Sequence, residues 1–360
     1  MGHSVLCWLG VLGTMLSAQW TIRTENVAIP PSFEDCWSLV ILPDVQYYNE
    51  TYPGLFELQT QWVRNQARSL RIQYVLLPGD ITNTNSQKEW ENASSALKIL
   101  DGHVPYAMCT GNHDCGPGGN AAERSTGLDT SFPYERLSGW TGLAGVKTAG
   151  QTANSYHLFE APGPSRWLIV TLEWAPTDET LQWASEILAR YPERNAILLV
   201  HAYLYHDDSR YDWKTKGDKQ DWNPHVYPTE PAGNDGQEIW DKLVRKHDNV
   251  FLVVSGHVIG DGTGLLISQT DGGRAVIQML VNYQTPIHDI GGQAWLRVMT
   301  FRRDLKKITC WSYSPLLKQY RSEPDQLFEL TWIEASPDTS APESTKTRSA
   351  AGTEQTSRAN

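Results

Sequence analysis

Short apolar runs alternate with amphipathic stretches in the first third of the chain. Residues 38–42, 74–77 and 104–108 have the length and composition of buried β-strands. Between them, residues 54–71 carry apolar side chains at helical spacing. Residues 86–100 begin with Ser86 and have Glu89 three positions later, the signature of a capping box. The order strand, helix, strand, helix, strand predicts parallel strands with helices against the sheet.

The pattern continues after a long polar segment. Residues 116–150 are rich in Gly, Ser and Thr and are expected to form a long loop with at most one short helix. Further strands are expected at residues 154–160, 167–173, 195–200 and 250–254, and helices at 178–190 and 236–246. A polar and aromatic insertion occupies residues 203–235. The last apolar runs, at 265–268, 275–283, 295–301 and 308–313, are spaced for an antiparallel sheet.

Composition limits the classes of partner. The chain has 360 residues, 40% of them hydrophobic, which is enough for a large buried core. A net charge of -11 at pH 7, without clusters of Lys or Arg, argues against a nucleic-acid-binding surface. Beyond the N-terminal region no span is long and apolar enough to cross a membrane. A substrate that carries phosphate would therefore have to be attracted by bound cations.

The two ends of the chain differ in composition from the middle. Residues 5–16 have the length of a signal-peptide core, although only His3 precedes them and no Lys or Arg does. We therefore expect residues 1–18 to be a signal peptide and the protein to be secreted or periplasmic. The folded domain is expected over residues 36–335, and the Ser- and Thr-rich residues 336–360 are expected to be a disordered tail.

Cysteine usage is compatible with export. Once Cys7 has left with the signal peptide, Cys36, Cys109, Cys115 and Cys310 remain, an even number that allows two disulfides. Cys109 and Cys115 flank one polar loop and are the expected pair, which leaves Cys36 to pair with Cys310. Four buried free thiols are the alternative.

Polar residues follow each of the expected parallel strands. Asp44-Val45-Gln46 follows the first, Gly79-Asp80 the second and Gly111-Asn112-His113-Asp114 the third. Later strands lead to His201 and to Gly256-His257. Each residue alone is explained by a turn, a cap or a core role. However, several acid-bearing strand ends that meet at one edge of a sheet repel one another unless cations neutralise them.

In this order, these residues resemble the motifs of the calcineurin-like metallophosphoesterases, specifically bacterial-type secreted members with Asp-x-Gln in the first motif. The resemblance spans residues 39–259. It implies an α/β fold, a four-layer α-β-β-α sandwich of two mixed β-sheets. It also implies two divalent metal ions, with Mn, Mg, Ca, Fe and Zn as candidates. By this resemblance Asp80 bridges both ions, Asn112, His201 and His257 complete the second site, and Asp44 and Gln46 belong to the first.

The same resemblance implies a mechanism. A hydroxide held by the metal ions attacks phosphorus in line, His113 acts as general acid toward the leaving oxygen, and Asp114 steadies the imidazole of His113. The activity implied is metal-dependent hydrolysis of a small phosphomonoester or phosphodiester.

Two positions depart from the family pattern. Gln46 stands where the first motif usually has His, and Ile259 stands where Gly-His-x-His usually has its second His. Both losses fall on the first metal site, which is therefore expected to be weaker, oxygen-rich and suited to hard ions such as Mg²⁺, Mn²⁺ or Ca²⁺. We expect Gln46 to coordinate through its amide oxygen. His206, Asp207, Asp208 and Gln284 are the alternative polar candidates for this site.

The insertion supplies candidates for substrate binding. His206, Arg210 and Tyr211 are expected to contact substrate, since Arg suits bidentate contact with phosphate. Trp213 and Trp222 are candidates for an aromatic rim. The alternative function is a secreted protein that binds carbohydrate or another ligand on a catalytically degraded scaffold. Retention of His113 and Asp114 favours the enzyme, because a binding protein has no need of a general acid.

Overall fold

The computed structural model describes residues 19–30, 34–163, 165–284 and 292–333. One compact unit spans Trp20–Trp332 and contains every site discussed below. A second unit, Met1–Gln19 with Ile333–Asn360, falls almost entirely outside the described residues. The expected signal peptide and C-terminal tail therefore lie outside the described residues. Among the described helices, none combines the length and apolar character needed to cross a membrane.

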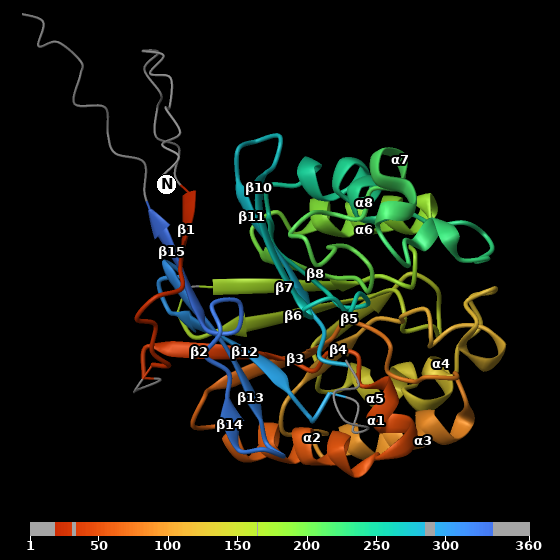
Figure 1. The fold of residues 1–360 in the computed structure, drawn as a ribbon, viewed down its shortest axis with the longest axis horizontal. Coiled ribbons are helices and arrows are strands. Elements are labelled where there is room, and N and C mark those ends of the chain that lie inside the picture. The colour runs from red at the N-terminus through yellow and green to blue at the C-terminus, as the bar shows by residue number, and fades with distance from the viewer. Residues whose placement is uncertain (1–18, 31–33, 164, 285–291, 334–360) are drawn as a thin grey trace, which may run out of the picture. The chain divides into compact units, whose positions relative to one another are not determined.

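Two mixed β-sheets form the centre of the compact unit (Figure 1). The first has the order β1-β15-β13-β12-β2-β3-β4, with β14 beside β13. Its strands are β1 (Gln19–Arg23), β2 (Cys36–Ile41), β3 (Ile72–Leu77), β4 (Tyr106–Met108), β12 (Leu296–Arg302), β13 (Lys307–Ser314), β14 (Gln319–Tyr320) and β15 (Phe328–Ile333). Strands β2, β3 and β4 run parallel, whereas β12 pairs antiparallel with both β2 and β13.

The second sheet has the order β10-β11-β9-β8-β7-β6-β5. Its strands are β5 (Leu143–Val146), β6 (Ser155–Ala161), β7 (Ser165–Thr171), β8 (Asn195–Leu199), β9 (Val250–Ser255), β10 (Thr263–Gln269) and β11 (Ala275–Val281). Strands β7, β8, β9 and β11 are parallel, and antiparallel strands flank them on both sides. The carboxyl ends of β8 and β9 therefore lie at the same edge of this sheet.

Helices cover the outer face of each sheet (Figure 1). The first sheet is covered by α1 (Gln46–Thr51), α2 (Gly54–Gln66), α3 (Gln87–Lys98), α4 (Leu128–Ser131) and α5 (Tyr134–Ser138). The second is covered by α6 (Asp178–Arg190) and α8 (Gly236–Lys242). Short elements complete the chain: α7 (Trp213–Lys216) and the 3₁₀ helices η1 (Pro117–Gly119), η2 (Gly217–Lys219), η3 (Pro224–Val226) and η4 (Val244–Lys246). The predicted four-layer α-β-β-α sandwich is confirmed.

The continuous apolar character of the central strands follows from burial on both faces. In β3, Tyr74 and Leu76 enter the core between the sheets, while Val75 and Leu77 pack under α2 and α3. Successive side chains of a strand point to opposite faces, so a strand covered on both sides is apolar at every position. This is why these strands were recognisable in the sequence.

Two expectations about secondary structure were wrong. Residues 116–150 contain η1, α4, α5 and β5 rather than one short helix at most. The four last apolar runs do not share one antiparallel sheet, because β10 pairs with β11 in the second sheet and β12 with β13 in the first. The reason is that β11 continues the parallel pairing with β9, and β12 joins β2 instead.

The expected disulfides do not form, and all four cysteines are free thiols. Cys109 lies in the core between the sheets, whereas Cys115 lies in the core beneath α6 and α8. Cys36 on β2 and Cys310 on β13 are separated by β12. Two inter-strand spacings amount to roughly 9 to 10 Å, beyond the roughly 7 Å that a disulfide spans between Cα atoms. The alternative of free thiols is therefore correct, but only Cys109, Cys115 and Cys310 among the four are buried, because Cys36 is partly exposed.

Candidate metal centre

Five parallel strands carry polar residues at their carboxyl ends. Three neighbouring strands of the first sheet and two of the second supply them: Asp44 follows β2, Asp80 follows β3, Asn112 follows β4, His201 follows β8 and His257 follows β9. All five side chains are buried. Residues as far apart in sequence as 44 and 257 thus meet at one place, because the backbone of His257 donates to Asp44 Oδ2 at 2.7 Å.

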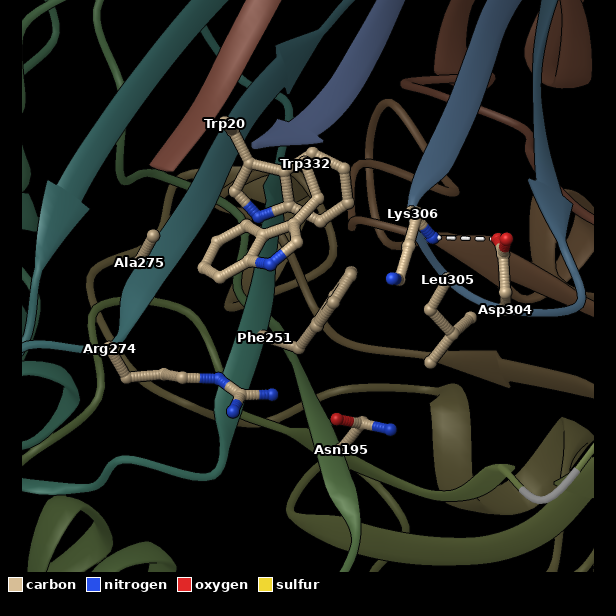
Figure 2. A pocket seen from close by; sticks show the side chains of 9 residues that line it. All are labelled: Trp20, Asn195, Phe251, Arg274, Ala275, Asp304, Leu305, Lys306 and Trp332. Atoms are coloured by element: carbon tan, nitrogen blue, oxygen red, sulfur yellow. Dashed lines mark hydrogen bonds between the residues drawn. The ribbon is translucent and has the colours of Figure 1, made fainter. Parts of the chain in front are cut away.

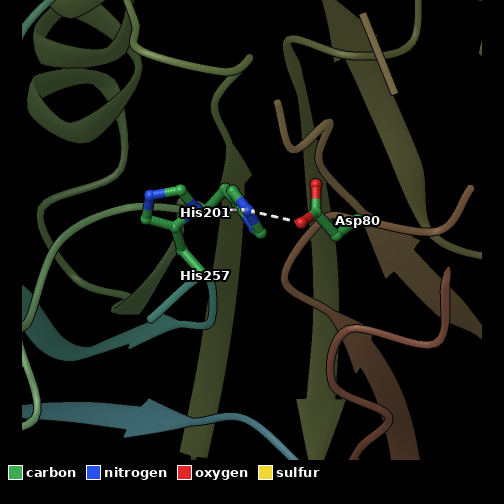
Figure 3. A group of neighbouring side chains, drawn as sticks. All are labelled: Asp80, His201 and His257. Carbon is green, nitrogen blue, oxygen red and sulfur yellow. Dashed lines mark hydrogen bonds and ion pairs between the residues drawn. The ribbon is translucent and has the colours of Figure 1, made fainter. Parts of the chain in front are cut away.

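His201 lies at the centre of the group (Figure 3). Its Nε2 atom is 3.3 Å from Asp80 Oδ2, 3.2 Å from Asn112 Oδ1 and 3.2 Å from His257 Nδ1. Asp80, His201 and His257 each offer one ligand atom, and these atoms all lie within 4.8 Å of one another. Such a set of carboxylate, amide and imidazole donors suits a divalent cation.

Backbone carbonyls orient both imidazoles. Nδ1 of His201 is 2.7 Å from the carbonyl oxygen of Pro78, and Nε2 of His257 is 2.7 Å from that of Trp222. A carbonyl only accepts, so each of these nitrogens carries the hydrogen. When the rings are neutral, Nε2 of His201 and Nδ1 of His257 therefore bear the lone pairs that face Asp80. This is the usual outer support of metal-ligating histidines.

The electrostatics of the group favour a positive charge between the side chains. Burial opposes protonation of His201, but the negative charge of Asp80 raises the pKa of His201 to about 9. Conversely, burial opposes ionisation of Asp80, but attraction to His201 and His113 lowers its pKa. Burial and the charge of His201 lower the pKa of His257 to about 3. A cation held by these donors would replace the proton on His201, because ligation needs the neutral ring.

The donors expected at the first site are buried and incompletely bonded. Asp44 Oδ2 accepts from Asn282 Nδ2 at 2.8 Å as well as from the backbone of His257. Asp44 Oδ1, both amide atoms of Gln46 and Oε1 of Gln284 are buried without a hydrogen-bond partner among the described residues. Burial raises the pKa of Asp44 well above its usual value; the positive charge of His201 opposes this rise and the negative charge of Asp80 adds to it. Unsatisfied buried oxygens are costly unless something such as a cation binds them, so these residues fit a metal site.

The backbone around these residues is strained. Asp44, Asp80 and His257 have φ angles of 35°, 49° and 79°. Positive φ is unfavourable for residues other than Gly and tends to persist at functional sites. Two glycines make room for the carboxylates: a Cβ on Gly111 would lie 2.1 Å from Asp80 Oδ1, and one on Gly256 would lie 2.1 Å from Asp44 Oδ1.

His113 and Asp114 have different partners from those expected. Nδ1 of His113 is 2.8 Å from the carbonyl oxygen of Asn83, which holds the imidazole, and its backbone donates to Asp80 Oδ1 at 3.0 Å. The carboxylate of Asp114 accepts from the backbone of Gly111, Ile81 and Thr82 and from the Thr82 hydroxyl. Asp114 therefore shapes the loop and does not steady the imidazole directly, which corrects the expected pairing of the two residues.

A pocket of about 140 Å³ opens over the metal-binding group. It is lined by Asp80, Asn112, His113 and His257 together with Tyr47, Trp222, Tyr227, Ile259 and Gln284. Gln284 is thus the one among the four polar candidates for the weak site that reaches this pocket, within the described part of the chain. Asp207 bonds to Ser209 and Lys216, and Asp208 accepts from the backbone of Leu265.

The three residues expected to contact substrate do not line this pocket. The guanidinium of Arg210 donates to Gln278 and Ser268 and lies 3.9 Å from the ring centroid of Trp240. Tyr211 is fully buried and donates to the carbonyl oxygen of Asp221. The ring of His206 packs against Tyr205 and Gly260. These side chains hold the insertion against the second sheet, a role that residue type alone does not distinguish from substrate binding.

Sequence reasoning missed Asn282, Tyr47 and Tyr227. Asn282 follows β11, which is parallel to β9, and it bonds to Asp44. Polar residues after parallel strands gather at one edge of a sheet, but the sequence pattern predicts an antiparallel strand at residues 275–283 and so does not single out Asn282. Tyr47 directly follows Gln46 in the first motif. No pattern in the sequence singles out Tyr227.

Two other features have the composition of a site but lie elsewhere. A cavity of about 300 Å³ is lined by Trp20, Phe251 and Trp332 with Arg274 and Lys306 nearby (Figure 2). It lies at the beginnings of β8 and β9, the opposite ends of the strands that carry His201 and His257. His225, Asp235 and Glu238 also form a cluster, but their mutual hydrogen bonds cap α8. Neither feature contributes to the metal-binding group.

Comparison with known proteins identifies relatives. A family model described as calcineurin-like phosphoesterase matches residues 38–262. The chain is 29% identical over 296 residues to the uncharacterized protein YvnB of Bacillus subtilis (strain 168). That match covers 81% of this chain but only 21% of the relative, so the chain spans about a fifth of the length of YvnB.

Three solved structures are similar at low identity. The purple acid phosphatase PPD1 from yellow lupin (Lupinus luteus) seeds has a TM-score of 0.48 and 16% identity, over 85% of this chain and 55% of that one. GAP50, the anchor in the inner membrane complex of Plasmodium, has a TM-score of 0.42 and 11% identity, over 79% and 87%. The NAD nucleotidase NadN of Haemophilus influenzae has a TM-score of 0.40 and 13% identity, over 82% and 49%.

Proposed function

Because the chain belongs to the calcineurin-like phosphoesterase family, we propose that it hydrolyses small phosphoesters with the help of two divalent cations. The observation that carries the proposal is the convergence on His201 Nε2 of ligand atoms from Asp80, Asn112 and His257, each within 3.3 Å. These residues come from both sheets, so only a common function of the strand ends explains why they are buried together.

Each residue has a defined part in this proposal. Asp80, Asn112, His201 and His257 hold one cation, and Asp44, with Gln46 and Gln284 as neutral oxygen donors, holds a second and weaker one. Divalent cations, when bound, polarise phosphoryl oxygens and lower the pKa of coordinated water. Because neutral amide donors replace imidazoles, the second cation should dissociate more easily. Its oxygen ligands favour hard cations.

His113 supplies the proton for the leaving group. Its Nδ1 is occupied by the carbonyl of Asn83, so Nε2 is the ring nitrogen available in the pocket. In the hydrolysis a water oxygen becomes bonded to phosphorus and gives up a proton to solvent. The bond from phosphorus to the leaving oxygen breaks, and that oxygen takes a proton from His113.

We also propose that the protein is exported, on the strength of residues 5–16 alone. The free thiols remove the supporting argument from disulfides. Measuring the protein in culture medium or periplasm against cytoplasm tests this, and retention in the cytoplasm would contradict it.

The function is tested with the intact chain and two p-nitrophenyl substrates, the phosphate monoester and the bis diester. Activity is expected with Mn²⁺ and is expected to disappear with a chelator and return on adding Mn²⁺. Asp80→Asn preserves the shape of the side chain and removes its charge, and it should lower both kcat and the content of bound Mn²⁺. Asp218→Asn, an exposed residue of the insertion, is the matched control. Bound Mn²⁺ without turnover of either substrate would favour the binding-protein alternative.

A further inference from the structure

Aromatic and aliphatic side chains line the pocket beside the polar residues. Tyr47, Trp222, Tyr227 and Ile259 line it together with Asp80 and His113. Trp222 remains 47% exposed, which is unusual for a side chain of this size next to a buried polar group. These side chains line the same pocket of about 140 Å³ as Asp80 and His113, so a substituent beyond the phosphoryl group can contact them.

No Lys or Arg lines the pocket within the described part of the chain. Arginines of neighbouring loops have other partners: Arg210 bonds to Gln278 and Ser268, Arg124 donates to main-chain carbonyl oxygens, including that of Ala175, and Arg321 pairs with Glu323. Among the described residues, the attraction for the negative charge of a substrate therefore comes from the histidines of the pocket and from bound cations.

This charge balance discriminates between ester classes. At neutral pH a phosphomonoester carries close to two negative charges, since its second pKa is about 6, whereas a phosphodiester carries one. Bound cations attract both classes of ester, but the second charge of a monoester finds no Lys or Arg among the described lining residues and lies near the carboxylate of Asp80. The second organic substituent of a diester, by contrast, finds aromatic and aliphatic side chains.

We propose that this site prefers phosphodiesters to phosphomonoesters, and that the ring of Trp222 binds the diester substituent that is not released when that substituent is planar or aromatic. The proposal rests on the function proposed above. Trp222 is the specificity-determining residue, because it is the most exposed ring that lines the pocket and aromatic rings stack favourably.

The main chain of Trp222 contacts a proposed metal ligand. The carbonyl oxygen of Trp222 accepts from Nε2 of His257, and the residue has a φ of 59°. The residue that carries this ring therefore also supplies the carbonyl oxygen that orients His257. Replacing the side chain leaves the carbonyl in place, so the effect of the ring is separable from the orientation of His257.

Three substrates with one leaving group test the proposal: p-nitrophenyl phosphate, methyl p-nitrophenyl phosphate and phenyl p-nitrophenyl phosphate. All release p-nitrophenolate, so differences in kcat/KM report the rest of the ester. With Mn²⁺ present, kcat/KM is expected to rise about tenfold from the monoester to the methyl diester, and about tenfold again to the phenyl diester.

Variants of two exposed tryptophans separate the ring from the fold. Trp222→Ala should reduce the ratio of phenyl to methyl diester hydrolysis to nearly one, with the content of bound Mn²⁺ unchanged, and Trp222→Phe should keep most of it. Trp213→Ala is the matched control, since Trp213 is an exposed Trp of the same insertion that lies outside the pocket. The Trp213→Ala variant should leave kcat/KM for all three substrates unchanged.

The outcomes are distinguishable. A monoester hydrolysed faster than both diesters would overturn the charge argument. A Trp222→Ala variant that slows all three substrates equally would show that the ring only supports His257. If wild-type protein with bound Mn²⁺ hydrolyses none of the three, the proposed function itself fails, and this inference fails with it.

Discussion

At the scale of single residues, the metal-binding group depends on backbone conformations that the sequence motif does not reveal. Asp44, Asp80 and His257 all have positive φ, which costs of order 1 kcal/mol or more each for residues other than Gly. The cost is tolerated because these conformations aim the side chains at one point. Gly111 and Gly256 allow the same arrangement, because each lacks a Cβ where a carboxylate oxygen lies.

Gly256→Ala should therefore weaken the first cation site selectively. The added methyl group would lie 2.1 Å from Asp44 Oδ1 and would displace this carboxylate. The proposed ligands grouped around His201, such as Asp80, would stay in place. Isothermal titration calorimetry of Gly256→Ala with Mn²⁺ is expected to show that the stronger site still binds Mn²⁺ and that the weaker site no longer does. Gly139→Ala is the control, because nothing lies within 4 Å of its added Cβ. Two sites of wild-type affinity in Gly256→Ala would contradict the assignment of Asp44.

The proposed role of His113 as general acid predicts that the effect of replacing it depends on the leaving group. His113→Ala should lower kcat about 10² to 10⁴-fold for an alkyl ester, whose alkoxide must be protonated, and only slightly for a p-nitrophenyl ester. The ratio of the two rates is the measurement, and exposed His103 replaced by Ala is the control. An equal loss with both esters would assign His113 to binding rather than to proton transfer.

The sequence was sufficient to nominate Asp44, Gln46, Asp80, Asn112, His113, His201 and His257, because each stands directly after a recognisable strand. It was insufficient for the partners of His113 and Asp114. Those depend on the turn that the loop makes after β4, where the carboxylate of Asp114 collects backbone donors and the imidazole finds the carbonyl of Asn83. Adjacent residues in a sequence need not point in related directions in a turn.

At the scale of elements, the N-terminus of α3 supports the loop that carries Asp80. The capping box between Ser86 and Glu89 is present as predicted from the sequence. The carboxylate of Glu89 also accepts from the backbone of Asn83 and Thr84. Asn83 is the residue whose carbonyl holds His113, so the helix cap and the catalytic loop are one hydrogen-bonded structure.

Replacing Glu89 by Gln should make the free energy of unfolding less dependent on pH in the acidic range. Burial opposes ionisation of Glu89, but hydrogen bonds from Thr84 and Ser86 lower its pKa below the usual 4.5. A lowered pKa in the folded state means that the stabilisation is present above pH 4.5 and is lost as the pH falls through the lower, folded-state value. Glu89→Gln should be less stable by about 1 to 2 kcal/mol at pH 7.

The measurement for Glu89 is urea unfolding between pH 7 and pH 3.5. The difference between wild type and Glu89→Gln is expected to stay constant down to about pH 5 and then to shrink. Glu91→Gln, on the exposed side of the same helix, is the control and should differ little from wild type at any pH. A difference that grows on acidification would refute the assigned direction.

Elements with strong periodicity were predictable and elements fixed by distant pairing were not. The helix expected at residues 178–190 is α6, and the strand before His201 is β8. In contrast, β1 and β15 pair with each other across nearly the whole chain, and β1 lies ahead of Cys36, the expected start of the domain. Neither strand has a local pattern strong enough to indicate it, because its pairing partner is what stabilises it.

At the scale of the whole molecule, the arrangement of the cysteines shows what spacing alone cannot tell. Sequence neighbours such as Cys109 and Cys115 belong to cores on opposite faces of the sheets. Alkylation of unfolded protein without reductant should therefore modify Cys36, Cys109, Cys115 and Cys310.

In the native state the buried Cys109 and Cys115 should react slowly with an alkylating reagent. Burial and the charge of Asp114 raise the pKa of Cys109 and Cys115, so little thiolate is available. Mass spectrometry after alkylation, with and without prior reduction, checks the prediction. If the mass added by alkylation appears only after reduction, the cysteines are paired in disulfides and the prediction is wrong.

Cation binding should stabilise the whole compact unit, because its ligands come from both sheets. Asp80 and Asn112 follow strands of the first sheet, and His201 and His257 follow strands of the second, so a bound cation joins the two. A ligand that binds only the folded state adds about 2.7 kcal/mol when present at 100 times its Kd. Thermal unfolding followed by circular dichroism should accordingly show a Tm that rises with Mn²⁺ concentration.

The Asp80→Asn variant distinguishes this linkage from a general effect of salt. Removing the charge at the centre of the group should abolish most of the rise in Tm, whereas Asp218→Asn should show the wild-type rise. Without Mn²⁺ the same substitution also relieves repulsion between Asp80 and the buried Asp44 and Asp114, whose pKa values Asp80 raises. An equal rise in both variants would mean that Mn²⁺ binds elsewhere, and the two sheets would then be held together by their shared apolar core alone.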